Sequence, residues 1–250
     1  MFVAATAEKM AKLKSEVEEV EIQCRVINRR ESLLGLKITK FSLLSKLEQE
    51  VKPFGDLWHV AYQWVKTVPI WLEGAFELLD ADEIEDTAND WWRSLQRLVN
   101  SNVKKYQSPT NLMYYVLEQL EKFRQYIPMI SALRTKGLNA RHWGIISGKF
   151  NVDLQPEFVT LQQLIDMGLW DAENLAIIKG ISEIALKEYV IENTLDGLEA
   201  EFRVIEYVAI NYRDKETWII KSLEDFMGLF EEFSLKVEAL KSNPYVAHFL

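Results

Sequence analysis

Three long segments of the sequence carry apolar residues at alternating spacings of three and four, the pattern of helices that pack along a seam. They cover residues 10–27, 177–202 and 223–240, and Glu188 interrupts the apolar series of the second segment. Because the three segments lie far apart in the chain, they predict an elongated bundle of antiparallel helices rather than a compact globule.

Shorter helices between these segments are marked by capping residues and helix breakers. Asp80 supplies an N-cap, and the carboxylates after it suit the first turn of a helix that extends to Leu98. Pro53 and Gly55 are predicted to end the first long helical region. Residues 108–111 open a further helix, and its predicted buried face consists of Leu112, Tyr115, Val116, Leu120, Phe123 and Ile127.

The stretch between residues 128 and 168 alternates between short helices and breaks. Pro128 and Gly137 flank a short helix predicted to end near Arg134, and another helix is predicted over residues 138–147. Residues 151–156 are predicted to form a loop, after which Thr160 caps a brief helix.

One region departs from helical spacing. Apolar residues alternate with others over residues 208–212 and again over 218–220, on either side of the polar residues 213–216. This alternation predicts a small β-hairpin near residues 205–220. The predicted fold class is therefore all-α, with at most one small hairpin.

We expect one continuous rod-like domain with three parts. Residues 1–50 form a long N-terminal helical segment, residues 51–150 a helical subdomain with a tryptophan-rich core, and residues 151–250 a helical subdomain with the possible hairpin. Trp58, Trp64 and Trp71 are predicted to anchor the core of the middle part.

The charge and cysteine content exclude several classes of protein. A net charge of −9, with scattered lysines and arginines, argues against a nucleic-acid-binding or membrane-binding surface. The single cysteine, Cys24, excludes an internal disulfide and is predicted to be a small buried apolar residue. The first residues do not resemble a signal peptide, and no apolar run is long enough to cross a bilayer, so we expect a soluble intracellular protein.

A search for chemically active sites gives no candidate. His59, His142 and His248 have no further histidine or cysteine at metal-ligand spacing. Residues 144–150 fail as a phosphate loop because three residues, not four, separate the glycines and because Phe150 stands where serine or threonine is needed. The acidic residues 80–86 fail as a calcium loop and are expected to form a solvated helix start. We therefore predict no catalytic, cofactor-binding or metal-binding residue.

Residues 133–143 are the most distinctive stretch of the chain. They combine two arginines, a glycine and an adjacent histidine and tryptophan between two predicted helices. We interpret them as a mechanical joint, in which Trp143 anchors the second helix and His142 bonds to the backbone or to a neighbouring carboxylate. The candidate structural or hinge residues are Arg134, Gly137, Arg141, His142 and Trp143.

The same stretch resembles a signature in the linker region of dynein heavy chains, where a leucine-arginine run, a small-residue break and Arg-His-Trp lie close together. Other stretches resemble the family in the same order, namely residues 71–80, 185–195, 212–220 and 242–249. Together the resemblance spans approximately residues 43–249 and is closer to axonemal than to cytoplasmic forms. The sequence differs from the family pattern at two places. Phe202 stands where the family usually has a tryptophan, and Glu231 and Glu232 stand where a pair of aspartates is common.

The resemblance implies a mechanical role. The family's linker is a curved helical rod that lies across a ring of six ATPase modules and bends as ATP is hydrolysed, which moves cargo along a microtubule. The chain would then be a piece of this lever without activity of its own, because ATP and magnesium are bound by ring modules that are absent here. Gly137 or the loop at residues 151–156 would be the place of flexing.

The implied partners are the ring modules of the same heavy chain and other dynein heavy, intermediate or light chains. Microtubules would be reached only indirectly, and no nucleic acid or membrane is implied. The implied location is the cytoskeleton of a ciliary or flagellar axoneme. The alternative is a non-enzymatic helical scaffold or adaptor, either spectrin-like or a coiled-coil interaction protein.

Overall fold

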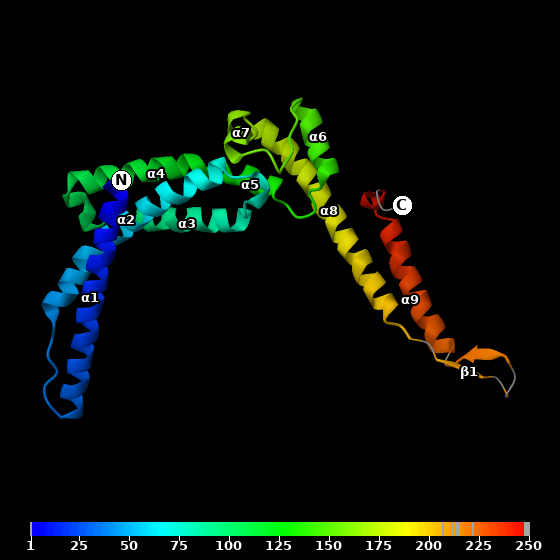
Figure 1. The fold of residues 1–250 in the computed structure, drawn as a ribbon, viewed down its shortest axis with the longest axis horizontal. Helices are drawn as coiled ribbons and strands as arrows, with labels where there is room; N and C mark the ends of the chain where they lie inside the picture. The colour runs from blue at the N-terminus through cyan, green and yellow to red at the C-terminus, as the bar shows by residue number, and fades with distance from the viewer. Residues whose placement is uncertain (1, 207, 212, 214–215, 222, 248–250) are drawn as a thin grey trace. The chain divides into compact units, whose positions relative to one another are not determined.

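A computed structural model describes residues 2–206, 208–211, 213, 216–221 and 223–247 (Figure 1). The fold is all-α with one small antiparallel hairpin, as predicted. The chain divides into two compact units, Met1–Arg134 with Gln155–Leu175, and Thr135–Leu154 with Ala176–Leu250. The predicted division at residues 50 and 150 stays a prediction.

The first unit contains most of the shorter helices. Its elements are α1 (Phe2–Leu33), α2 (Ser42–Glu73), the 3-10 helix η1 (Phe76–Leu78), α3 (Ala81–Leu98), the 3-10 helix η2 (Asn102–Lys105), α4 (Gln107–Arg124), α5 (Ile127–Leu133) and α7 (Leu161–Asp166). Helices α1 and α2 pack against each other as a helical hairpin, and α2 continues on to pack with α3 and α4 (Figure 1).

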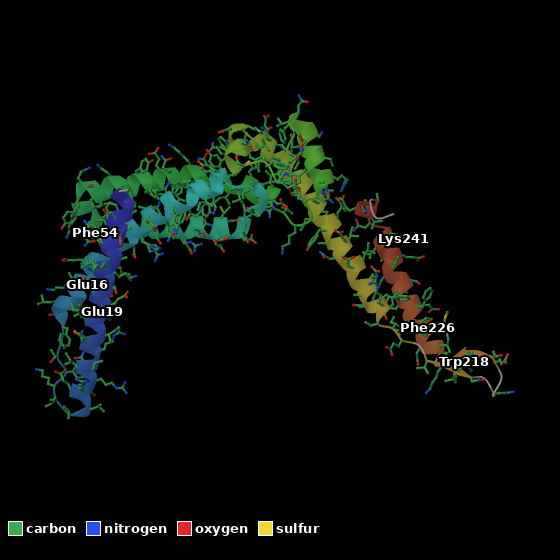
Figure 2. All side chains as sticks on the ribbon, in the orientation of Figure 1. Glu16, Glu19, Phe54, Trp218, Phe226 and Lys241 are labelled. Atoms are coloured by element: carbon green, nitrogen blue, oxygen red, sulfur yellow. The ribbon has the colours of Figure 1, made fainter. Side chains whose placement is uncertain are left out.

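Helix α2 corrects one prediction, because it runs through Pro53 and Gly55 without ending. A proline inside a helix removes one hydrogen bond and costs about 3 kcal/mol. The residues after it outweigh this cost, since Leu57, Trp58 and Val60 are buried and each contributes about 1.5–3 kcal/mol. Phe54 also lies within α2 (Figure 2), and its ring centroid lies 5.6 Å from that of Tyr106.

Aromatic rings form the core where α2, α3 and α4 meet. The Trp71 ring stacks on Trp91 and on Phe123, with 5.6 Å between centroids in both pairs. Trp64 meets the same two rings edge-on at 6.1 and 6.0 Å. Such pairs add about 0.5–1.5 kcal/mol to the free energy gained by burial. The tryptophans of α2 therefore anchor the core, as predicted.

The buried face of α4 differs in part from the prediction. Val116, Leu120 and Phe123 are buried, whereas Tyr115 is 59% exposed. The face is instead completed by Met113 and Leu117. Tyr115 lies two residues after Met113, more than half a turn around the helix, so it cannot share a face with it.

The second unit contains α6 (Ala140–Phe150), most of α8 (Ala172–Arg203), α9 (Leu223–Lys241) and the 3-10 helix η3 (Pro244–Val246). Strands β1 (Ala209–Asn211) and β2 (Trp218–Ile220) form the hairpin, with Ile210 opposite Ile219. The hairpin prediction is confirmed, and Tyr212 and Asp214 of the predicted pattern lie outside the described residues.

Several helix ends follow the sequence prediction. Asp80 caps α3 by accepting hydrogen bonds from the backbone N–H groups of Asp82 and Glu83. Thr160 caps α7 in a reciprocal arrangement with Gln163, and residues 151–156 form neither helix nor strand.

Cys24 is half-buried rather than buried as predicted, because α2 covers only part of α1.

Candidate functional site at the start of helix α6

Helix α6 begins with a reciprocal cap that places a histidine. The Asn139 side chain accepts a hydrogen bond from the backbone N–H of His142 at 3.4 Å. In return, Nδ1 of His142 accepts one from the backbone N–H of Asn139 at 3.3 Å. The second position of such a cap is usually glutamate or glutamine. Here the cap fixes the imidazole ring at the first turn of α6.

The other ring nitrogen of His142 contacts a buried carboxylate of α8. Nε2 of His142 lies 3.1 Å from Oε2 of Glu188, and the Arg141 guanidinium bonds to the same oxygen. His142 is 1% exposed and Glu188 6%, while the Arg141 side chain reaches solvent. One glutamate oxygen is therefore shared by two donors of α6.

The contacts define the tautomer of His142. Because Nδ1 accepts a hydrogen bond from a backbone N–H, Nδ1 is not protonated, and the neutral imidazole carries its hydrogen on Nε2. That hydrogen points at Glu188. Arg141 lies 2.9 Å from Nε2 but has no lone pair to offer, so the two nitrogens are neighbouring donors to one carboxylate.

Gly137 closes the same joint by lying directly against α8. Its φ angle is +89°, and an added Cβ would lie 2.4 Å from Cβ of Tyr189 and 2.7 Å from the carbonyl oxygen of Ala185. Residues 185, 188 and 189 of α8 share one helix face. Backbone and side chains before and within α6 thus meet one face of α8.

The structure brings together Gly137, Arg141 and His142 of the predicted joint residues. Trp143 follows them, 5% exposed. Arg134 belongs to the first unit, where it follows α5 and its Nε donates to the carbonyl of Leu79 at 2.8 Å. Their roles as hinge residues stay predictions.

Sequence reasoning missed Glu188 as a member of this site. The sequence showed Glu188 only as a polar residue that interrupts an apolar series. The structure explains the interruption, because the buried Glu188 carboxylate pairs with Arg141 and His142 of α6. A carboxylate between isoleucines of one seam is the signal that points to a buried partner. Beside it, Lys187 donates to the Tyr245 hydroxyl at 3.1 Å, and this bond raises the pKa of Lys187.

The contacts described above join the start of α6 to α8. Among the described residues no group of three or more histidines, cysteines, aspartates or glutamates could hold a metal ion. Residues 144–150 lie in α6, His59 is exposed on α2, and His248 lies outside the described residues. In the part of the chain that the structure describes, no helix has the length and apolarity of a membrane span.

The fold and this joint define a helical structural module built of unequal helices rather than repeats. The family model described as "Dynein heavy chain, N-terminal region 2" matches residues 44–250. The chain therefore belongs to the dynein heavy-chain family, and the resemblance noted in the sequence is confirmed.

Three relatives are axonemal heavy chains of much greater length. The chain is 27% identical to dynein axonemal heavy chain 1 of Mus musculus, over 96% of this chain and 6% of that protein. It is 26% identical to the Homo sapiens form over the same shares. Dynein axonemal heavy chain 3 of Homo sapiens is 25% identical, again over 96% of this chain and 6% of that protein. The chain thus spans a small fraction of these relatives.

Proposed function

We propose that this chain is the linker segment of a dynein heavy chain, a lever that converts ATP-driven changes of the motor ring into movement along microtubules. The match of the family model to residues 44–250 carries the proposal. The segment itself has no catalytic role in this proposal, and ATP and magnesium are bound by ring modules elsewhere in the heavy chain.

A lever must transmit force without yielding inside its packed parts. The shared bonding of Arg141 and His142 to Glu188 supports this role, because it ties α6 to one position on α8. The close approach of Gly137 to Ala185 adds a second tie. The stacked rings of Trp71, Trp91 and Phe123 give the first unit a comparably firm core.

The partners and location follow from the relatives in this proposal. The segment contacts the ring modules of its own heavy chain and lies within an assembly of dynein heavy, intermediate and light chains. It reaches microtubules only through the rest of the motor. Because the relatives described above are axonemal heavy chains, we place it in a ciliary or flagellar axoneme.

The test uses the full heavy chain that carries this segment, assayed for microtubule gliding and for ATP turnover. Removing residues 44–250 is expected to abolish gliding while ATP hydrolysis persists. Gliding at the velocity of the intact motor would overturn the proposal.

A point variant tests the joint within the same motor. Arg141→Ala should lower the gliding velocity severalfold and leave ATP turnover nearly unchanged, because it loosens force transmission only. Arg203→Ala is the matched control, since Arg203 also pairs with a glutamate, Glu199, but in an exposed position. Equal velocities for the two variants would contradict a mechanical role for the joint. ATP hydrolysis by the isolated 250-residue chain would contradict the absence of activity.

A further inference from the structure

One serine of the chain follows a pair of arginines. Arg29 and Arg30 are the only adjacent arginines of the sequence, and Ser32 lies three and two positions after them, with Leu33 next. Protein kinases select substrates by charge pattern. A kinase with an acidic substrate groove binds arginines at these two positions before the reacting serine, and prefers an apolar residue after it. The stretch therefore matches such a groove at each of these positions.

The structure leaves this stretch open to an incoming protein. Ser32 and both arginines are exposed near the end of α1, and every residue from 26 to 41 is exposed or half-buried. Among the residues that the structure describes, neither arginine forms an ion pair, whereas Arg25, one turn earlier, pairs with Glu21. The two guanidinium groups are thus available to the carboxylates of a partner.

Two sets of hydrogen bonds hold the end of α1. The helix ends in a glycine cap, in which the backbone N–H groups of Gly35 and Leu36 donate to the carbonyls of Ser32 and Glu31. The φ angle of Gly35 is +68°, as this kind of cap requires. In addition, the backbone N–H and the hydroxyl of Thr39 each donate to the Glu31 carboxylate at 2.6 Å.

Little else has to open before a kinase can bind. Residues 34–41 connect α1 to α2 without helix or strand (Figure 1). No side chain between residues 26 and 41 would have to leave a buried site. Because helix ends fray, residues 29–34 can adopt the extended conformation in which kinases bind their substrates.

We propose that Ser32 is phosphorylated by an arginine-directed protein kinase and that the phosphate opens the last turn of α1. In the reaction, Oγ of Ser32 attacks the γ-phosphorus of ATP, the bond from this phosphorus to the β–γ bridging oxygen breaks, and ADP leaves. An aspartate of the kinase takes the hydroxyl proton. The proposal goes beyond force transmission and does not rest on it.

The added charge acts against the helix end. Phosphoserine carries a charge of about −1.5 to −2 at pH 7, and the carbonyl end of a helix carries about −0.5, so the two repel each other. Glu31 precedes the phosphate directly and adds to the repulsion. Arg29 lies three residues earlier on the same side of α1, but an exposed ion pair with it contributes little. We therefore expect the cap at Gly35 and the bonds from Thr39 to weaken.

Phosphorylation of the 250-residue chain tests the assignment, with ATP and the catalytic subunit of cyclic AMP-dependent protein kinase as the probe. Mass spectrometry should find one phosphate, on Ser32. Arg29→Gln with Arg30→Gln should lower kcat/KM about a hundredfold, because two charge-assisted contacts are lost. Labelling of another residue, an unlabelled wild-type chain, or a double variant as fast as the wild type would overturn the assignment.

Ser108→Ala is the matched control for the serine. Ser108 is also exposed and also follows two adjacent basic residues, Lys104 and Lys105, but Pro109 comes directly after it. This variant should incorporate phosphate as the wild type does, whereas Ser32→Ala should incorporate none. The reverse result would overturn the assignment.

A peptide of residues 26–38 separates the effect of the sequence from that of the fold. The peptide has no helix end to open, so it should react about tenfold to a hundredfold faster than the chain. A chain more than about a thousandfold slower than the peptide would show that α1 withholds Ser32, and would overturn the assignment.

Hydrogen exchange measures the effect of the phosphate on α1. In the phosphorylated chain the amides of residues 34–39 should exchange severalfold faster, while those of α3 stay unchanged as an internal control. Treatment with a phosphatase should restore the original exchange. Equal or slower exchange at residues 34–39 in the phosphorylated chain would overturn the opening of the last turn.

Discussion

A methyl group at position 137 would meet the backbone and a side chain of α8 at once. In Gly137→Ala, Cβ would lie 2.4 Å from Cβ of Tyr189 and 2.7 Å from the carbonyl oxygen of Ala185. The φ angle of +89° costs an alanine about 1–2 kcal/mol. The overlap costs about 1–3 kcal/mol more if the structure shifts to relieve it. We therefore expect a loss of about 2–5 kcal/mol from the free energy of unfolding.

Gly148→Ala provides the matched control within α6. Beyond its chain neighbours and the nearby backbone of α6, no atom lies within 4 Å of its added Cβ, and the residue is helical, so alanine should stabilise the helix by about 1 kcal/mol. Thermal unfolding measures both variants, and hydrogen exchange of the α6 amides localises the effect. The two substitutions should shift stability in opposite directions. A Gly137→Ala chain that unfolds with the wild type, with α6 equally protected, would refute the packed joint.

Other substitutions give expected outcomes that are measured separately. Trp143→Ala should lower the free energy of unfolding by about 3–5 kcal/mol in denaturant titration, because the side chain is 5% exposed. Glu188→Gln should destabilise by about 1–3 kcal/mol, since it leaves the buried His142 and the partly exposed Arg141 with a weaker acceptor. Asp80→Ala should cost about 1 kcal/mol through the lost cap of α3. Side-chain and backbone hydrogen bonds from Thr39 lower the pKa of Glu31, so their stabilising effect is lost as pH falls through the lowered pKa. An NMR titration should show a higher pKa for Glu31 in Thr39→Val.

Local sequence signals predicted most helix ends because the interactions that set them are local. Asp80 and Thr160 cap their helices through backbone groups two or three residues away, which spacing alone reveals. Pro53 was misread for the opposite reason. Its cost is local and visible, whereas the burial of Leu57 and Trp58 that offsets it depends on distant helices.

Only the residues of the candidate site that lie before and within α6 were predictable from the sequence. The stretch at residues 133–143 stood out through its composition, and the structure gives Gly137, Arg141 and His142 a common surface on α8. The partner Glu188 lies 47 residues from Arg141. No local pattern relates two positions at that separation, so an isolated carboxylate in an apolar series was the sole hint.

A buried ion pair is a poor source of stability, because removing its charges from water costs nearly as much as their attraction returns. At this joint, the ion pair instead fixes the position of α6 along α8. Arg141 and His142 reach Glu188 only at one setting of α6 along α8, and a slip of one turn would leave the carboxylate buried without a partner. Gly137 imposes the same setting sterically, since its contact with Ala185 leaves no room for a Cβ. Two independent constraints on one register are what a lever of the proposed kind requires, since it must resist sliding under load more than it must resist unfolding.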